Sequence, residues 1–261
     1  MLNSTNLRLV LGFFKNIFNK ERVLEPISLL TLGADMHSHL IAGVDDGAET
    51  IRDSINLIKE LRKFGLRHLI TTPHIMSDLY LNKKSDLERR AEILRIEIEK
   101  EKLDVTLQVS AEYFLDSHFT DLIKKKELMP FGNNHILFEM SFMEKSPLLQ
   151  ECIFEFQSAG YKPILAHPER YGYMHQNLEK YVSLHEQGVS LQLNINSVTG
   201  HYGPFVKKAS EELIERNVIS FLGTDCHHPG HIELMKSAVK SPLVHKLVNS
   251  GFLKNASLLT N

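Results

Sequence analysis

Cysteine, tryptophan and long apolar runs are scarce in this sequence of 261 residues. Tryptophan is absent, and the two cysteines, Cys152 and Cys226, are too few for a disulfide-stapled scaffold, which favours a reducing cytoplasm. The apolar run from Leu9 to Phe14 is too short to cross a bilayer, and no small-residue cleavage site follows it. The net charge of −2 at pH 7, with no lysine or arginine block, argues against a nucleic-acid partner. The sequence therefore predicts a cytoplasmic protein without a transmembrane segment.

Residues 1–32 form an N-terminal extension to the single domain that we expect over residues 33–261. The apolar side chains of this extension recur at helical spacing, at Leu7, Val10, Phe14 and Ile17. This spacing predicts a short amphipathic helix, which would pack on the domain, on a partner or on a membrane surface.

The rest of the chain alternates short apolar runs with amphipathic segments. Together with the stretch that opens at Gly33, seven runs predict strands, the others being residues 66–72, 105–111, 135–140, 162–167, 189–195 and 218–224. Strands that alternate with helices imply a parallel sheet with crossover connections. Seven such units favour closure into a (β/α) barrel of the TIM type over an open doubly wound sheet, which is the structural alternative.

The intervening segments carry helical stripes of apolar residues. One stripe, Ile51, Ile55, Ile58 and Leu61, follows a capping pattern at residues 50–53. A second stripe, Leu87, Ala91, Leu94 and Ile98, follows a similar pattern at residues 85–88. A later segment has Pro204 in its expected first turn, where proline is tolerated.

Polar side chains stand where each predicted strand ends. They are His37, His39, His74, Glu112, Glu139, His167, Asn194, Asn196, Asp225 and His227. In a parallel barrel the carboxyl ends of all strands meet at one face, so these side chains should converge. Polar residues without a shared role would be scattered between both ends of the strands.

Histidine and carboxylate without thiolate suit divalent zinc, manganese or iron. With Asp46, from the loop after the first strand, the candidates are five histidines and four carboxylates, too many for one ion. A carboxylate can bridge two ions roughly 3.5–4 Å apart. Arg170, three residues beyond His167, offers the planar fork that grips phosphate oxygens. The pattern thus predicts a multinuclear metal site that binds phosphate.

The motifs "DMHSHLIAGVDDGAET", "TTPHIMSD", "ILAHPERY" and "GTDCHH" resemble the PHP (polymerase and histidinol phosphatase) superfamily. Within it they are most similar to the bacterial protein-tyrosine phosphatases encoded with capsule and exopolysaccharide genes. The resemblance spans roughly residues 33–250. It implies a distorted seven-stranded (β/α) barrel and three divalent metal ions, with manganese first and iron or zinc as alternatives. The implied partner is a phosphotyrosine protein, the tail of a bacterial tyrosine kinase, and a homo-oligomer stays open.

The resemblance also implies a division of the ligands among the three metals. The first set is His37, His39, Glu112 and Asp225. The second set shares Glu112 and adds Glu139 and His167. The third set is Asp46, His74 and His227. Asp45 is the residue most easily confused with Asp46, because only the spacing of the family motif separates the two.

The expected reaction is hydrolysis of phosphotyrosine by a metal-bound hydroxide. The candidate catalytic residues are Arg170, Asp46 and His227, with His227 as a proton donor if it is not a ligand. The family often has a second phosphate-binding arginine after the last motif, but this sequence has "HHPGHIELM" there. Arg170 would bind the phosphate alone, or His228 or His231 would bind it together with Arg170.

A phosphocysteine mechanism is excluded, because neither cysteine has an arginine six positions later. Two other functions are compatible with the metal ligands. One is hydrolysis of histidinol phosphate or another small phosphomonoester, and the other is a metal-binding partner protein without turnover. Tyr113, Tyr171 and Tyr173 either stack on a substrate ring or pack within the domain. Cys226, between two candidate ligands, is expected to pack in the core.

Overall fold

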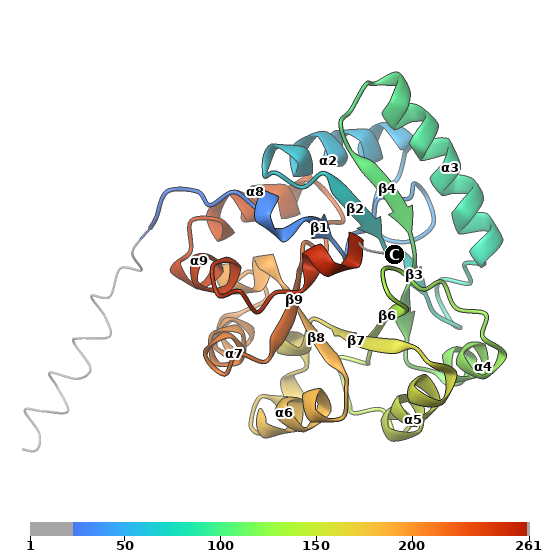
Figure 1. Ribbon diagram of the computed structural model, residues 1–261, viewed down its shortest axis with the longest axis vertical. Helices are drawn as coiled ribbons and strands as arrows, with labels where there is room; N and C mark the ends of the chain where they lie inside the picture. The colour runs from blue at the N-terminus through green and yellow to red at the C-terminus, as the bar shows by residue number, and fades with distance from the viewer. Residues whose placement is uncertain (1–22, 260–261) are drawn as a thin grey trace, which may run out of the picture.

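The computed structural model describes residues 23–259, so the amphipathic helix predicted within residues 1–32 lies largely outside the described residues (Figure 1). The described residues form an α/β fold in which every paired strand is parallel. This agrees with the α/β class predicted from the alternating pattern. Among residues 23–259, no helix combines the length and the apolar character needed to cross a membrane.

Within residues 23–259, nine strands lie in two sheets. They are β1 (Ala34–Asp35), β2 (His68–Thr71), β3 (His74–Ile75), β4 (Thr106–Val109), β5 (Glu112–Phe114), β6 (His135–Glu139), β7 (Lys162–Ala166), β8 (Ser190–Asn194) and β9 (Ile219–Gly223). One sheet has the order β1-β2-β4, and the other has the order β3-β5-β6-β7-β8-β9. Strands therefore occur at all seven predicted places, and two further short strands, β3 and β5, lie just beyond two of them.

The strands predicted over 66–72 and 105–111 contain β2 and β4, and each is followed by a short strand of the other sheet, β3 or β5, that was not predicted. Pro73, which has no N–H to donate, separates β2 from β3. The backbone N–H of Glu112, at the start of β5, donates to the carbonyls of Thr72 and Pro73. The strands predicted over 66–72 and 105–111 are confirmed, but β3 and β5 were missed because local apolar runs do not reveal a change of pairing partner.

A backbone link joins the first and last strand segments beyond their paired residues. Ser38 and Cys226 form an isolated parallel bridge. The N–H of His39 donates to the carbonyl of Cys226 at 3.0 Å, and the N–H of Asp225 donates to the carbonyl of His37 at 2.7 Å. These bonds hold the segments after β1 and β9 side by side.

The helices lie around the outside of the strands (Figure 1). They are α2 (Ile51–Lys63), α3 (Lys84–Lys100), α4 (Ser117–Lys125), α5 (Leu149–Ala159), α6 (Glu179–Glu186), α7 (Pro204–Glu215), α8 (Pro229–Ala238) and α9 (Pro242–Val248). Short 3₁₀ helices are η1 (Leu30–Leu32), η2 (Pro168–Arg170), η3 (Gly172–Met174), η4 (Ile195–Thr199) and η5 (Asn255–Leu259).

The predicted helix starts are partly confirmed. Thr50 and Asp53 form the expected reciprocal capping box at the start of α2, and Pro204 is the first residue of α7. The capping pattern predicted at residues 85–88 was wrong, because α3 begins earlier, after Lys83, which makes no side-chain cap. Both predicted apolar stripes face the core, with Ile51 only partly buried.

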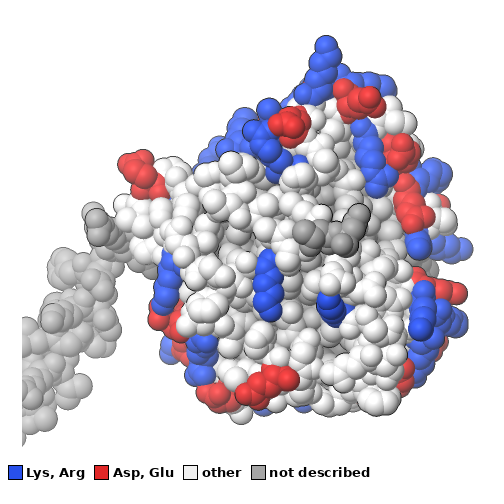
Figure 2. All heavy atoms as spheres, viewed as in Figure 1, with Lys and Arg blue, Asp and Glu red and all other residues white. Residues whose placement is uncertain are grey.

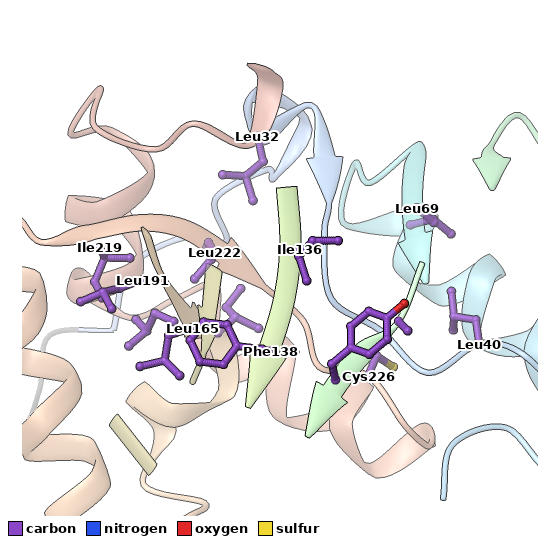
Figure 3. Packing of buried hydrophobic residues seen from close by; sticks show 14 of the residues in the cluster. Leu32, Leu40, Leu69, Ile136, Phe138, Leu165, Leu191, Ile219, Leu222 and Cys226 are labelled. Carbon is purple, nitrogen blue, oxygen red and sulfur yellow. The ribbon is translucent and has the colours of Figure 1, made fainter. Parts of the chain in front are cut away.

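Strand β6 is apolar on both faces and lies between two layers of side chains. Ile136 and Phe138 of β6 belong to a large core cluster that includes helix residues, and Leu137 belongs to a smaller cluster. This split follows the period of two along a strand. Cys226 is fully buried in the larger cluster, as predicted, and Figure 3 shows it among the core side chains. The face seen in Figure 2 carries both charge signs, mostly toward its edges.

Candidate metal centre

The structure brings all nine predicted ligands together, with His74 and Glu112 as the first residues of β3 and β5 and the others at or after strand ends. Strand register explains the placement, because His74 in β3 pairs with Glu112 in β5, and Phe114 pairs with Glu139 at the end of β6. His167 directly follows β7. Seven of these side chains, all except His37 and His39, line a cavity of about 420 Å³.

The deepest part of the site is a quartet of His37, His39, Glu112 and Asp225, all fully or almost fully buried. Nε2 of His37 lies 3.1 Å from Oε2 of Glu112 and 3.3 Å from Oδ1 of Asp225. Nε2 of His39 lies 3.4 Å from each of the same two oxygens. The two Nε2 atoms are 3.3 Å apart.

These separations fit a divalent cation. Ligand atoms about 2.0–2.1 Å from a tetrahedral ion lie roughly 3.3–3.4 Å from one another. The quartet therefore has the edge lengths of a four-coordinate site. It is also the set predicted for the first metal, and the structure brings these four residues together as one group.

Glu112 is the centre of the wider cluster. Its Oε1 accepts a hydrogen bond from Nε2 of His167 at 2.9 Å. Nδ1 of His74 lies 3.3 Å from the other oxygen of Glu112 and 3.1 Å from Oε1 of Glu139. His74, Glu112 and Glu139 form a second group of mutually close donors, with His167 on the other oxygen of Glu112. The predicted second set thus gains His74 as a neighbour.

A third group stands nearer the solvent. Asp46 is half-exposed, and its Oδ1 lies 3.5 Å from Nε2 of His74 and 3.5 Å from Nε2 of His227. His39 completes this group. The predicted third set of Asp46, His74 and His227 is therefore brought together, although His74 faces two groups at once.

Electrostatics within the cluster favour charged side chains despite their burial. Burial alone would lower the pKa of His37, but Glu112 and Asp225 outweigh it and raise that pKa to about 9. Burial would raise the pKa of Asp225, yet His37 and His227 hold it well below its usual range. The hydrogen bond and charge of His227 lower the pKa of Asp46. A cation would replace the protons that the histidines hold among these carboxylates.

Residues outside the predicted set orient the histidines. Nδ1 of His39 donates to Oδ2 of Asp45 at 2.8 Å, and Nδ1 of His37 donates to Oε1 of Gln192 at 2.9 Å. Each bond turns Nε2 toward the donor cluster, as outer hydrogen bonds do in metal sites. The sequence signal for Asp45 was its place beside Asp46. No sequence pattern marked Gln192, which lies inside a strand.

Local backbone geometry supports these positions. An added Cβ at Gly47 would lie 2.3 Å from the carbonyl oxygen of His39, which explains the glycine after the aspartate pair. His167 and Asp225 have positive φ angles of 33° and 48°. Such angles are uncommon for non-glycine residues and recur at functional sites.

Arg170 stands at the edge of the cavity between two aromatic rings. Its guanidinium carbon lies 4.4 Å from the ring centre of Phe142 and 4.5 Å from that of Tyr202. Its Nη1 donates to Oδ2 of Asp225 at 3.3 Å. His228 and His231, the predicted substitutes for a second arginine, line the same cavity.

The predicted tyrosines pack rather than line the cavity. Tyr113 is buried and its hydroxyl accepts from the N–H of Met129. Tyr171 is buried and its hydroxyl donates to the carbonyl of Ala166. The aromatic side chains that do line the cavity are Tyr80, Phe114, Phe142 and Tyr202.

Residues 33–257 match the family described as capsular polysaccharide synthesis, CpsB/CapC. The chain belongs to this family. Among CpsB/CapC relatives, it is 29% identical over 233 residues to a protein named putative tyrosine-protein phosphatase CapC of Staphylococcus aureus, covering 87% of this chain and 91% of the relative. It is 28% identical to tyrosine-protein phosphatase YwqE of Bacillus subtilis, covering 74% of this chain and 77% of the relative.

Solved structures agree with the CpsB/CapC assignment. The fold matches a chain from the crystal structures of YwqE from Bacillus subtilis and CpsB from Streptococcus pneumoniae, described as unique metal-dependent tyrosine phosphatases. That match has a TM-score of 0.74 and 26% identity, and covers 85% of this chain and 94% of the other. The lactonase Lmo2620 from Listeria monocytogenes, at 14% identity, TM-score 0.55 and coverage of 91% and 99%, shares the fold alone.

Proposed function

We propose that this CpsB/CapC chain is a metal-dependent protein-tyrosine phosphatase that acts in capsular or exopolysaccharide synthesis. The relatives named above are tyrosine-protein phosphatases, and the matching crystal structures are of metal-dependent ones. The observation that carries the proposal is the quartet of His37, His39, Glu112 and Asp225, whose atoms have the spacing of a metal's ligands. Arg170 stands beside this quartet to take a phosphate.

We assign the donors to three divalent ions, with manganese first. The deep quartet would hold the first ion. Glu112 and Glu139, with His167, would hold the second, and Asp46 and His227 would hold the third. His74 is close enough to serve either of the outer two. When bound, such ions supply activated water at neutral pH and positive charge against the phosphate.

The chain's own residues bind and orient the substrate. Arg170 is held by two rings and keeps its charge, because Asp225 raises its pKa against the opposing effect of burial. Its fork would grip two phosphate oxygens. His228 and His231 line the same cavity and would supply further hydrogen bonds where the family often has an arginine.

The leaving phenolate needs little help from an acid, because it is a fairly good leaving group. His227 and Asp46 lie at the solvent side of the cluster, 3.5 Å apart, where the leaving group would depart. If His227 is not a ligand, it would hold the proton for the leaving oxygen. Water reaches this point, because Asp46 is half-exposed.

The same proposal includes the closure of the strands into a barrel, the cellular location and the partner. We infer a distorted seven-stranded barrel over residues 33–261, since the Ser38–Cys226 bridge links the two strand segments that would close it. The expected location is the cytoplasm, and the expected partner is the phosphorylated tail of a tyrosine kinase. We assign residues 1–32 to an N-terminal extension of this domain.

The test is turnover of a phosphotyrosyl peptide beside histidinol phosphate, after EDTA treatment and again after manganese is restored. We expect peptide turnover to vanish with EDTA and to return with manganese. Arg170→Ala should raise KM for the peptide without changing the bound metal. Selective turnover of histidinol phosphate would contradict the tyrosine-phosphatase assignment and keep the metal centre. Full activity in protein shown to be metal-free would contradict the metal assignment.

A further inference from the structure

The mouth of the cavity has an apolar half and a polar half. The apolar half comes from the ends of three neighbouring strands, β3, β5 and β6. Its lining residues are Met76, Leu79, Tyr80, Phe114 and Phe142. The polar half comes from the segments after β7, β8 and β9, with Arg170, His228 and His231. A substrate that enters therefore meets two different surfaces.

Large apolar side chains on the apolar half are exposed to solvent. Leu79 is 71% exposed and Phe142 is 42% exposed. Their chain neighbours are exposed too, Leu81 by 73% and Met143 by 87%. We call these four residues the apolar rim. Grouped apolar exposure at the edge of a polar site is typical of an interaction surface.

Charge does little to select a partner here. The loop from Met76 to Asn82 has one charged residue, Asp78, and the loop after β6 has Glu144 beside Lys145. Charges of both signs nearly cancel, so neither a strongly acidic nor a strongly basic segment is favoured. The contact that this half of the mouth offers is burial of apolar surface.

The apolar rim is continuous with the metal centre. Tyr80, which precedes Leu81, stacks on the candidate ligand His74 with ring centres 5.4 Å apart. Phe142, which precedes Met143, packs against Arg170. When a substrate places its phosphate at Arg170, the parts of the substrate next to that phosphate therefore lie against the apolar rim. This continuity favours the substrate's own polypeptide as the occupant over a membrane or a second copy of the chain.

We infer that the apolar rim binds the residues that flank phosphotyrosine in the substrate, and that these residues are large and apolar. An extended chain advances about 3.3 Å per residue, so the three residues on either side of the phosphotyrosine each span roughly 10 Å. This inference rests on the proposed function. It specifies the preferred substrate of that reaction, which is a phosphotyrosine within an apolar segment of a protein.

The experiment compares two phosphotyrosyl peptides, one flanked by leucine and methionine and one flanked by serine and glycine, with p-nitrophenyl phosphate as a small substrate. The manganese-loaded wild type is compared with the double variant Leu81→Ser/Met143→Ser. Phe154→Ser is the matched control, because Phe154 is 65% exposed on α5 and does not line the cavity.

We expect the wild type to prefer the apolar peptide by about tenfold in kcat/KM, the effect of partly burying one or two large side chains. The double variant should lose this preference and keep its turnover of p-nitrophenyl phosphate, and Phe154→Ser should match the wild type. Equal turnover of both peptides by the wild type would overturn the inference and leave the phosphatase assignment intact. Turnover of neither peptide would contradict the proposed function itself. A double variant that changes only the sedimentation of the protein would mark a self-association surface, and would also overturn the inference.

Discussion

Two adjacent aspartates have different roles at the scale of single residues. Asp45 is buried against His39 and also accepts from the backbone N–H groups of Gly47 and His74. Asp46 is half-exposed and faces His74 and His227. Asp45 thus belongs to the folded framework, and Asp46 stands with the proposed ligands.

Asp46→Asn should therefore remove about one equivalent of bound metal with little change in the stability of the metal-free protein, since exposed substitutions usually stay within about 0.5 kcal/mol. Asp45→Asn should lower the free energy of unfolding by about 1–3 kcal/mol, because it weakens a buried hydrogen-bonded pair. Metal analysis and urea unfolding of the two metal-free variants measure the difference. The assignment would be wrong if the two variants exchanged these effects.

We expect both cysteine thiols to be unreactive and to take no part in catalysis. Both are buried, and burial raises the pKa of the Cys152 and Cys226 thiols, so neither forms the reactive thiolate at neutral pH. We expect iodoacetamide to leave the turnover of the native, metal-loaded protein unchanged and Cys152→Ala to retain activity. Loss of turnover on alkylation, with the metal content intact, would contradict the metal-based mechanism.

At the scale of elements, three segments meet at one guanidinium. Arg170 comes from η2, Phe142 from the loop after β6, and Tyr202 from the loop before α7. Cation–π contacts contribute about 0.5–2 kcal/mol each, depending on their exposure. The two rings therefore hold Arg170 in place before phosphate arrives.

Tyr202→Leu should raise the inhibition constant for inorganic phosphate by about three- to tenfold, consistent with the loss of one such contact. Tyr202→Phe keeps the ring and should behave as the wild type. In an Arg170→Ala background, Tyr202→Leu should have no further effect on phosphate inhibition. An equal effect in both backgrounds would show that Tyr202 acts on the site without Arg170.

The elements also show which features could be predicted from the sequence. Strand positions, the α2 capping box and the gathering of histidines and carboxylates near strand ends depend on local patterns, and these predictions agree with the structure. The short strands β3 and β5 were missed, because they depend on which strand is the neighbour. Gln192 and Tyr202 were missed as site residues because their roles come from contacts with His37 and Arg170, which are distant in the chain.

At the scale of the whole molecule, the metal centre couples stability to pH. In the metal-free protein the pKa of His37 is raised to about 9, mainly because Glu112 and Asp225 outweigh the effect of burial. The unfolded chain releases this proton near pH 6.5. The proton therefore stabilises the metal-free fold below about pH 6.5, and this contribution is lost as the pH rises toward 9.

Metal binding has the opposite dependence, because a cation must displace the proton on His37 and is bound more tightly as the pH rises. A saturating ligand at 100 times its Kd adds about 2.7 kcal/mol to the free energy of unfolding. We expect the gap in Tm between manganese-loaded and metal-free protein to widen from pH 6.5 to pH 8.5. Calorimetry of manganese binding in two buffers of different ionisation enthalpy should also show proton release at pH 7.

His175→Gln is the control and should leave the trend unchanged. Among the described contacts, the His175 ring bonds only to the Glu169 carbonyl. A gap that stays constant with pH, with no proton released, would mean that His37 is neutral in the metal-free protein, and that the cluster balances its charge in another way.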